Sequence, residues 1–186
     1  MQDNLLSSVP VTALRPLSQL ALIDLSGNRI AHVPDDAFTT LPLTTLKLAD
    51  NNLTLADNAF RGLETTLKNL NLKGTQLRHL PPAVGSLKSL AFLDLAQNNI
   101  RQLADDQFAN MLSLTALNLE RNALDQLAED VFNGVNATLS SLSLLNNLMD
   151  QFPTKALAKL TKLRVSDINP STYYLIKCNM NARNKE

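Results

Sequence analysis

One pattern recurs along most of the chain and limits what the chain can fold into. Its form is L-x-x-L-x-L-x-x-N-x-L, and its clearest copies are residues 20–30 (LALIDLSGNRI) and 90–100 (LAFLDLAQNNI). Copies begin at Leu20, Leu43, Leu67, Leu90, Leu114 and Leu139. A period of about 23 to 25 residues is typical of stacked repeats, in which each unit buries its apolar side against its neighbours. The sequence therefore predicts a solenoid of about six repeats.

The spacing inside each copy predicts a short strand followed by a polar turn. Successive strand residues point to opposite sides, so the two Leu of the L-x-L core share one side and the residue between them takes the other. The Asn three positions after the second Leu ends the strand, and its amide can both donate to and accept from the backbone of adjacent repeats. This predicts a structural ladder made of Asn28, Asn51, Asn98, Asn122 and Asn147.

The third copy departs from this ladder, because Thr75 stands where the other copies have Asn. A threonine has too few polar atoms to serve the repeats on both sides. We therefore expect a weaker rung at Thr75, by about 1 kcal/mol.

A second apolar column follows nine or ten residues after the ladder positions. Its members are Phe38, Phe60, Phe108 and Phe132, with Val84 and Leu157 as substitutes. Acidic residues precede each Phe, as in DDAF at 35–38 and EDVF at 129–132, and we expect them to cap short helical turns. Paired carboxylates for acid–base catalysis are the weaker interpretation, because the pairs recur at equivalent outer positions without a partner base.

Stacked units of this kind predict an α/β solenoid that curves into an arc. A parallel sheet lines the concave face, and short helices or turns cover the convex face. We expect a single domain over residues 1–186, with a partial repeat at 1–19 and a degenerate last repeat and tail at 163–186. The last repeat is degenerate because Ser166 stands where an apolar residue is expected.

These motifs resemble the leucine-rich-repeat family, and the Phe-containing copies resemble its typical subclass, known mainly from extracellular receptors and matrix proteins. The resemblance covers most of residues 4–163 and implies that the concave face binds a protein ligand. Residues 77–87 look more like repeats of intracellular and plant members. Extracellular members also carry Cys-rich caps, whereas Asn169-Pro170 has no cysteine near it before Cys178. Either the cap is absent or the chain is a fragment.

Several other functions find little support in the sequence. The chain has 17 basic and 17 acidic residues, which argues against nucleic acid as a partner. No apolar run has the roughly 20 residues that would insert into a membrane. His32 and His79 are expected about 10 Å apart, too far to share a metal ion, so no metal or cofactor is expected. Catalytic motifs such as H-E-x-x-H and G-x-S-x-G do not occur, and the chain is not expected to be an enzyme.

The concave face is where residues are free of the repeat pattern, and so it is the candidate ligand-binding surface. Phe92 is the strongest candidate, because an exposed aromatic there can anchor a partner. Partial burial of Phe92 against Leu22 or Ala116 is the alternative. The full candidate set is Lys47, Asp50, Asn71, Lys73, Phe92, Asp94, Asn118, Glu120, Arg121 and Asn146.

The first hypothesis for the function is recognition of a protein ligand by an extracellular or cell-surface module of a receptor or matrix protein. An intracellular, cytoplasmic scaffold is the alternative, as is a regulatory or noncatalytic part of an enzyme. Two sequons, at Asn52 and Asn136, are possible glycosylation sites that suit the extracellular interpretation. They add little to it, because a chain so rich in Asn, Ser and Thr contains such triplets by chance.

Overall fold

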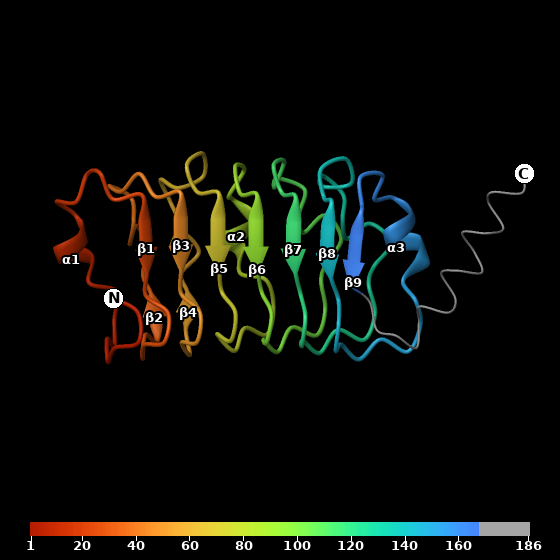
Figure 1. Ribbon diagram of the computed structural model, residues 1–186, viewed down its shortest axis with the longest axis horizontal. Helices are drawn as coiled ribbons and strands as arrows, with labels where there is room; N and C mark the ends of the chain where they lie inside the picture. Colours follow the sequence, from red (N-terminus) through yellow and green to blue (C-terminus); the bar gives the residue numbers. More distant parts are fainter. Residues whose placement is uncertain (168–186) are drawn as a thin grey trace, which may run out of the picture.

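The computed structural model describes residues 1–167 and shows a solenoid built on one parallel sheet (Figure 1). Seven strands lie side by side in chain order, and each begins two residues after a repeat start that the sequence predicted, the degenerate one at residue 163 included. They are β1 Leu22–Asp24, β3 Thr45–Lys47, β5 Asn69–Asn71, β6 Phe92–Asp94, β7 Ala116–Asn118, β8 Ser141–Ser143 and β9 Val165–Asp167. The predicted leucine-rich solenoid is therefore confirmed.

The strand register stacks the apolar residues of successive repeats. Leu46 of β3 pairs with Ile23 of β1 on one side and with Leu70 of β5 on the other, and the same register continues through Leu93, Leu117 and Leu142. These side chains are buried, and so are the Leu residues that follow two positions later, such as Leu48 and Leu95. Because every repeat places its L-x-L core on the same side, the core is one continuous column along the solenoid.

The side of the solenoid away from this sheet contains little regular structure. Within residues 1–167 it has three helices, each of one turn or little more: α1 Val11–Leu14, α2 Pro82–Gly85 and α3 Thr154–Ala158. A small second sheet pairs β2 His32–Val33 with β4 Thr54–Leu55 in the first two repeats. Turns form most of the remainder, so the expected short helices are few.

The Phe column packs inside these turns. Phe38 stacks on Phe60 with ring centroids 6.3 Å apart, and Phe108 stacks on Phe132 at 6.1 Å. Val84, fully buried, lies between the two pairs in sequence, whereas Leu157 is only half-buried. The aromatic stack is therefore interrupted in the third repeat.

Acidic residues that precede Phe38, Phe108 and Phe132 bond to the next repeat instead of capping helical turns. The Asn58 N–H donates to Asp35 Oδ1 at 2.8 Å, and the Asp130 N–H donates to Asp105 Oδ1 at 3.2 Å. Asp36 pairs with Arg61 in the following repeat at 3.1 Å. The capping prediction was wrong because the segments around Phe38 and Phe108 are turns and not helices, and the carboxylates accept from a neighbouring turn.

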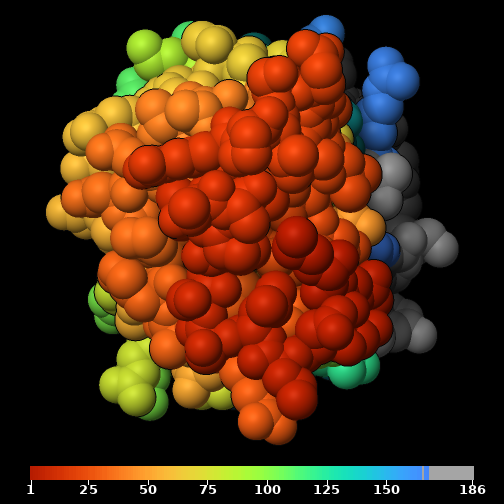
Figure 2. All heavy atoms as spheres, turned by 90° about the vertical axis from the view of Figure 1, so that its left-hand side faces the viewer, coloured from red at the N-terminus to blue at the C-terminus, as the bar shows by residue number. Residues whose placement is uncertain are grey.

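The N-terminal residues continue the repeat geometry onto the first full repeat. Asn28 Nδ2 donates to the Met1 carbonyl, and the Leu6 N–H donates to Asn28 Oδ1. Figure 2 looks at this end, which is formed by the first residues of the chain. The expectations for Asn169-Pro170, Cys178 and most of the predicted tail lie outside the described residues.

Candidate binding surface

The surface of the sheet that faces away from the core carries two columns of side chains. We call it the strand face and define it by the first and third residues of the strands β1, β3, β5, β6, β7 and β8. The first column is Leu22, Thr45, Asn69, Phe92, Ala116 and Ser141, and the third-residue column is Asp24, Lys47, Asn71, Asp94, Asn118 and Ser143. Because the strands are parallel and in register, members of one column lie on neighbouring strands.

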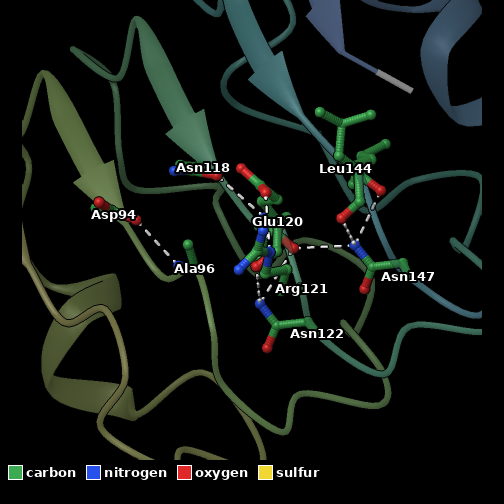
Figure 3. A network of polar contacts seen from close by, with 10 residues as sticks. Asp94, Ala96, Asn118, Glu120, Arg121, Asn122, Leu144 and Asn147 are labelled. Atoms are coloured by element: carbon green, nitrogen blue, oxygen red, sulfur yellow. Dashed lines mark hydrogen bonds and ion pairs between the residues drawn. The ribbon is translucent and has the colours of Figure 1, made fainter. Parts of the chain in front are cut away.

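Four residues of the third-residue column have a structural role that sequence reasoning missed. Each accepts a hydrogen bond from the backbone N–H two residues later: Ser26 to Asp24, Lys73 to Asn71, Ala96 to Asp94 and Glu120 to Asn118, all at 2.9 to 3.0 Å. Such a turn, closed by an Asx side chain, ends the strand. Two of these bonds are visible in Figure 3. The recurrence of Asp or Asn at this position was the sequence signal for this role.

The remaining candidate residues fall into two groups. Lys73 and Glu120 lie two positions after the third strand residue and extend the strand face. Asp50, Arg121 and Asn146 lie one position further, in a turn with left-handed backbone, with φ of 53°, 54° and 56°. They share this column with Gln97 and with two glycines. These three candidates therefore lie at the edge of the strand face, next to the ladder, and not on the strands.

Charges on the strand face are partly paired with one another. Lys47 Nζ lies 3.3 Å from Asp24 Oδ2, and Arg121 Nε lies 3.3 Å from Glu120 Oε1. Burial raises the pKa of Asp94; the Ala96 N–H and the charge of Lys73 oppose this rise, and the charge of Glu120 adds to it. Burial also raises the pKa of Asp24, but the Ser26 N–H and hydroxyl and Lys47 outweigh that effect and lower it overall. Folding thus shifts the pKa values of these two carboxyls, which belong to one column, in opposite directions.

Phe92 is the large aromatic side chain on this face. It is 38 % exposed and pairs across the strands with Asn69 and Ala116. Leu22 belongs to the same column but lies three strands away and is itself 53 % exposed. Leu22 therefore does not cover Phe92, and Ala116 is too small to do so.

Next to this surface runs the ladder of asparagine side chains (Figure 3). Asn122 Nδ2 donates to the Leu95 carbonyl of the preceding repeat and to the Leu119 carbonyl of its own, while its Oδ1 accepts from the Ile100 N–H. Bonds of the same pattern are made by Asn28, Asn51, Asn98 and Asn147. The ladder positions the end of every strand relative to its neighbours.

Thr75 makes only part of these contacts. Its Oγ1 donates to the Leu72 carbonyl of its own repeat at 2.7 Å, and both its N–H and its hydroxyl lie within hydrogen-bond distance of Asn98 Oδ1. By the spacing of the other rungs, an Asn at this position would also donate to the Leu48 carbonyl and accept from the Leu53 N–H. Thr75 makes neither bond, so the third repeat is held to the second by fewer side-chain bonds.

The histidines and the two sequons lie away from the strand face. His32 Nδ1 is 2.9 Å from Thr54 Oγ1, and His79 is exposed. Asn52 is exposed and Asn136 is half-buried. Among residues 1–167, no three His, Cys, Asp or Glu side chains are grouped in a way that could hold a metal ion.

Comparison with known proteins places the chain in a family. The family model described as "Leucine rich repeat" matches residues 1–53, 18–77 and 65–124. The chain therefore belongs to the leucine-rich-repeat family.

Individual relatives match parts of longer proteins. Human leucine-rich repeats and immunoglobulin-like domains protein 1 is 34 % identical over 115 residues, which are 61 % of this chain and 10 % of that protein. Toll-like receptor 13, solved in complex with ssRNA13, superposes with a TM-score of 0.82 at 32 % identity, covering 89 % of this chain and 24 % of the receptor chain. Human 5T4, a Wnt-activated inhibitory factor, gives 0.75 at 31 % identity, covering 91 % and 68 %.

Other relatives that share these repeats, keratocan and Toll-like receptor 8 among them, are extracellular or cell-surface proteins. The chain spans only about a tenth to a third of the length of the first curated relatives it matches. In the part of the chain that the structure describes, no helix has the length and apolar character needed to cross a bilayer.

Proposed function

We propose that this chain is a noncatalytic recognition module that binds a protein ligand through its strand face, with Phe92 as the central anchor. The observation that carries this proposal is the exposure of Phe92 on a regular sheet, where it contributes little to the core. Aromatic side chains that become fully desolvated on binding are the commonest energetic centres of protein interfaces.

The groups around Phe92 define the kind of partner that fits. Phe92 is flanked by Ala116 on one neighbouring strand and Asn69 on the other, and 38 % of it remains exposed to a partner. Further along the strand face, the charges of Lys73 and Glu120 act on the carboxylate of Asp94, so both signs of charge lie on the same face as the ring. A complementary partner would place an apolar side chain against Phe92 and polar groups of both signs at its edge.

A protein partner is favoured over a nucleic acid one. The relative solved with single-stranded RNA shows that a protein of this fold can bind such a ligand. In this chain, however, Lys47 is paired with Asp24, and acidic residues are as numerous as basic ones. Phosphate binding depends on concentrated and unpaired basic groups.

The relatives support an extracellular or cell-surface location, with the chain as one part of a longer receptor or matrix protein. An intracellular scaffold, or a noncatalytic part of an enzyme, would use the same face. Partners recovered from culture medium and cell surfaces, compared with those from cytosol, would distinguish these locations.

The test uses the full chain as bait, mass spectrometry to identify partners, and titration of each partner against variants. Phe92→Ala should weaken binding tenfold or more, about 1.4 kcal/mol, because the anchor is removed. His79→Ala is the matched control, because His79 is exposed away from the strand face. A larger loss with His79→Ala than with Phe92→Ala would show that another surface binds the partner. Tight binding of single-stranded RNA that depends on Lys47 and Lys73 would overturn the proposal of a protein ligand in favour of a nucleic acid.

A further inference from the structure

The two sequons differ in how the fold presents them. Asn52 follows ladder residue Asn51 directly, in the loop between β3 and β4, and is exposed. Asn51 donates to the Leu25 and Leu48 carbonyls, whereas the Asn52 side chain takes no part in the ladder within residues 1–167. The acceptor amide of Asn52 is therefore free to carry a substituent without loss of a rung.

The repeat pattern indicates that this position tolerates side chains of different kinds. Its equivalents in other repeats are Arg29, Gln76, Asn99, Ala123 and Leu148, which range from a guanidinium to an alkyl group. All of these except Ala123 are exposed. A position that accepts such different groups points into solvent and does not constrain packing.

The surroundings of Asn52 suit a sugar. Asn52 borders a shallow hollow of about 540 Å³ that is also lined by Arg29, Asp50 and Gln76. These side chains offer hydrogen-bond donors and acceptors to hydroxyl groups. The hollow lies beside the ladder and not on the strand face.

Asn136 is placed differently. It is half-buried, and its carbonyl accepts hydrogen bonds from both the N–H and the hydroxyl of Thr161 in the next repeat, at 3.0 and 3.2 Å. The Thr138 hydroxyl of this sequon donates to the Val135 carbonyl. A glycan at Asn136 would begin on a half-buried residue whose backbone is bonded to the next repeat.

We propose that Asn52 is an N-glycosylation site of this protein and that Asn136 is not occupied. The proposal rests on the extracellular location in the proposed function. The donor is a lipid-diphosphate-linked oligosaccharide of the secretory pathway. The Asn52 amide nitrogen forms a bond to C1 of the first sugar and gives up one proton, while the bond from C1 to the diphosphate oxygen breaks and the lipid diphosphate leaves.

One consequence concerns which surface remains available. A glycan at Asn52 covers the ladder side of the first three repeats, around Arg29 and Gln76, and leaves Phe92 uncovered. A glycan at Asn52 would start beside the ladder in the second repeat, whereas Phe92 lies on the strand face in the fourth repeat, so the two sites can be tested separately.

The experiment expresses the full chain behind a secretion leader in human cells and treats the secreted protein with peptide N-glycosidase in ¹⁸O water. Mass spectrometry should find Asn52 converted to labelled Asp and Asn136 unlabelled. Asn52→Gln should lose the mass of one glycan and keep its thermal midpoint, because Asn52 is exposed and the ladder bonds of Asn51 remain. Asn136→Gln is the matched control and should carry the same glycan mass as the parent.

An unlabelled Asn52 in the secreted chain, a labelled Asn136, or an Asn52→Gln variant of unchanged glycan mass would overturn the proposal. Retention of the chain in the cell without a glycan at Asn52 would also overturn it. The Phe92 binding test uses unglycosylated protein from bacteria, so it can succeed or fail independently.

Discussion

At the scale of single residues, the carboxylate of Asp94 is both favoured and disfavoured by its surroundings. Its carboxylate ends a strand by accepting from the Ala96 N–H, yet burial and the charge of Glu120 disfavour its ionised form. Asn71 and Asn118 close the same turn without a charge. Asp94→Asn should therefore keep the turn and stabilise the protein at neutral pH, by no more than about 1 kcal/mol because this carboxyl is partly solvated.

The stability gained by Asp94→Asn should depend on pH. A carboxyl whose pKa is raised by folding costs stability when it is ionised, so the gain from Asp94→Asn should disappear as pH falls below the ordinary Asp value of 3.8. Asp24 provides the comparison, because folding lowers its pKa. Asp24→Asn should reduce stability at neutral pH, and this loss should vanish in acid. Urea denaturation from pH 3 to pH 7 measures both, and parallel curves for the two variants would contradict the assignment.

At the scale of the repeat element, the buried Phe contributes most to packing between neighbours. Phe132 is 2 % exposed and stacks on Phe108. Phe132→Ala should lower the free energy of unfolding by about 3–5 kcal/mol, because it leaves a cavity between two repeats. Leu157→Ala is the control in the same column, and its half-buried side chain should cost distinctly less. Urea midpoints measure both variants, and equal losses would mean that burial in this column does not determine stability.

The sequence predicted those features of a repeat that depend on residues within that repeat alone. The L-x-L spacing places the strands of the large sheet, and the Phe position identifies the second buried column, because both depend on residues within a single copy. Asp35 and Asp105 were misassigned because their bonds go to the following repeat, and the left-handed backbone of Arg121 has no local signal comparable to glycine. The Asx turns at Asp24 and Asp94 were visible as a recurring residue type, but their position on the strand face favoured a binding interpretation.

At the scale of the whole molecule, the solenoid divides near its third repeat, residues 67–89. This repeat has neither a ladder Asn nor a stacked Phe, because Thr75 stands at the first position and Val84 at the second. The aromatic pairs Phe38–Phe60 and Phe108–Phe132 lie on either side of it. The stability of a repeat protein is approximately a sum of repeat terms and nearest-neighbour interface terms. The interface between the second and third repeats is therefore the weakest part of the central solenoid.

The whole-molecule prediction is that the N-terminal repeats open before the central ones. Amides of β1 and β3 should exchange hydrogen through a partial opening with a lower free energy than amides of β6 and β7, because the first two repeats can separate at the Thr75 rung without disrupting the rest. Thr75→Asn should supply the missing bonds to the Leu48 carbonyl and the Leu53 N–H, strengthen this interface by about 1 kcal/mol and bring the two exchange free energies closer together.

Asn98→Thr, which removes the bond to the Leu72 carbonyl, is the reverse control and should create a second opening between the third and fourth repeats. Native-state hydrogen exchange in increasing urea measures these free energies strand by strand. Equal values for β1 and β7 in the parent chain, or no change with Thr75→Asn, would show that the third repeat couples its neighbours as strongly as any other.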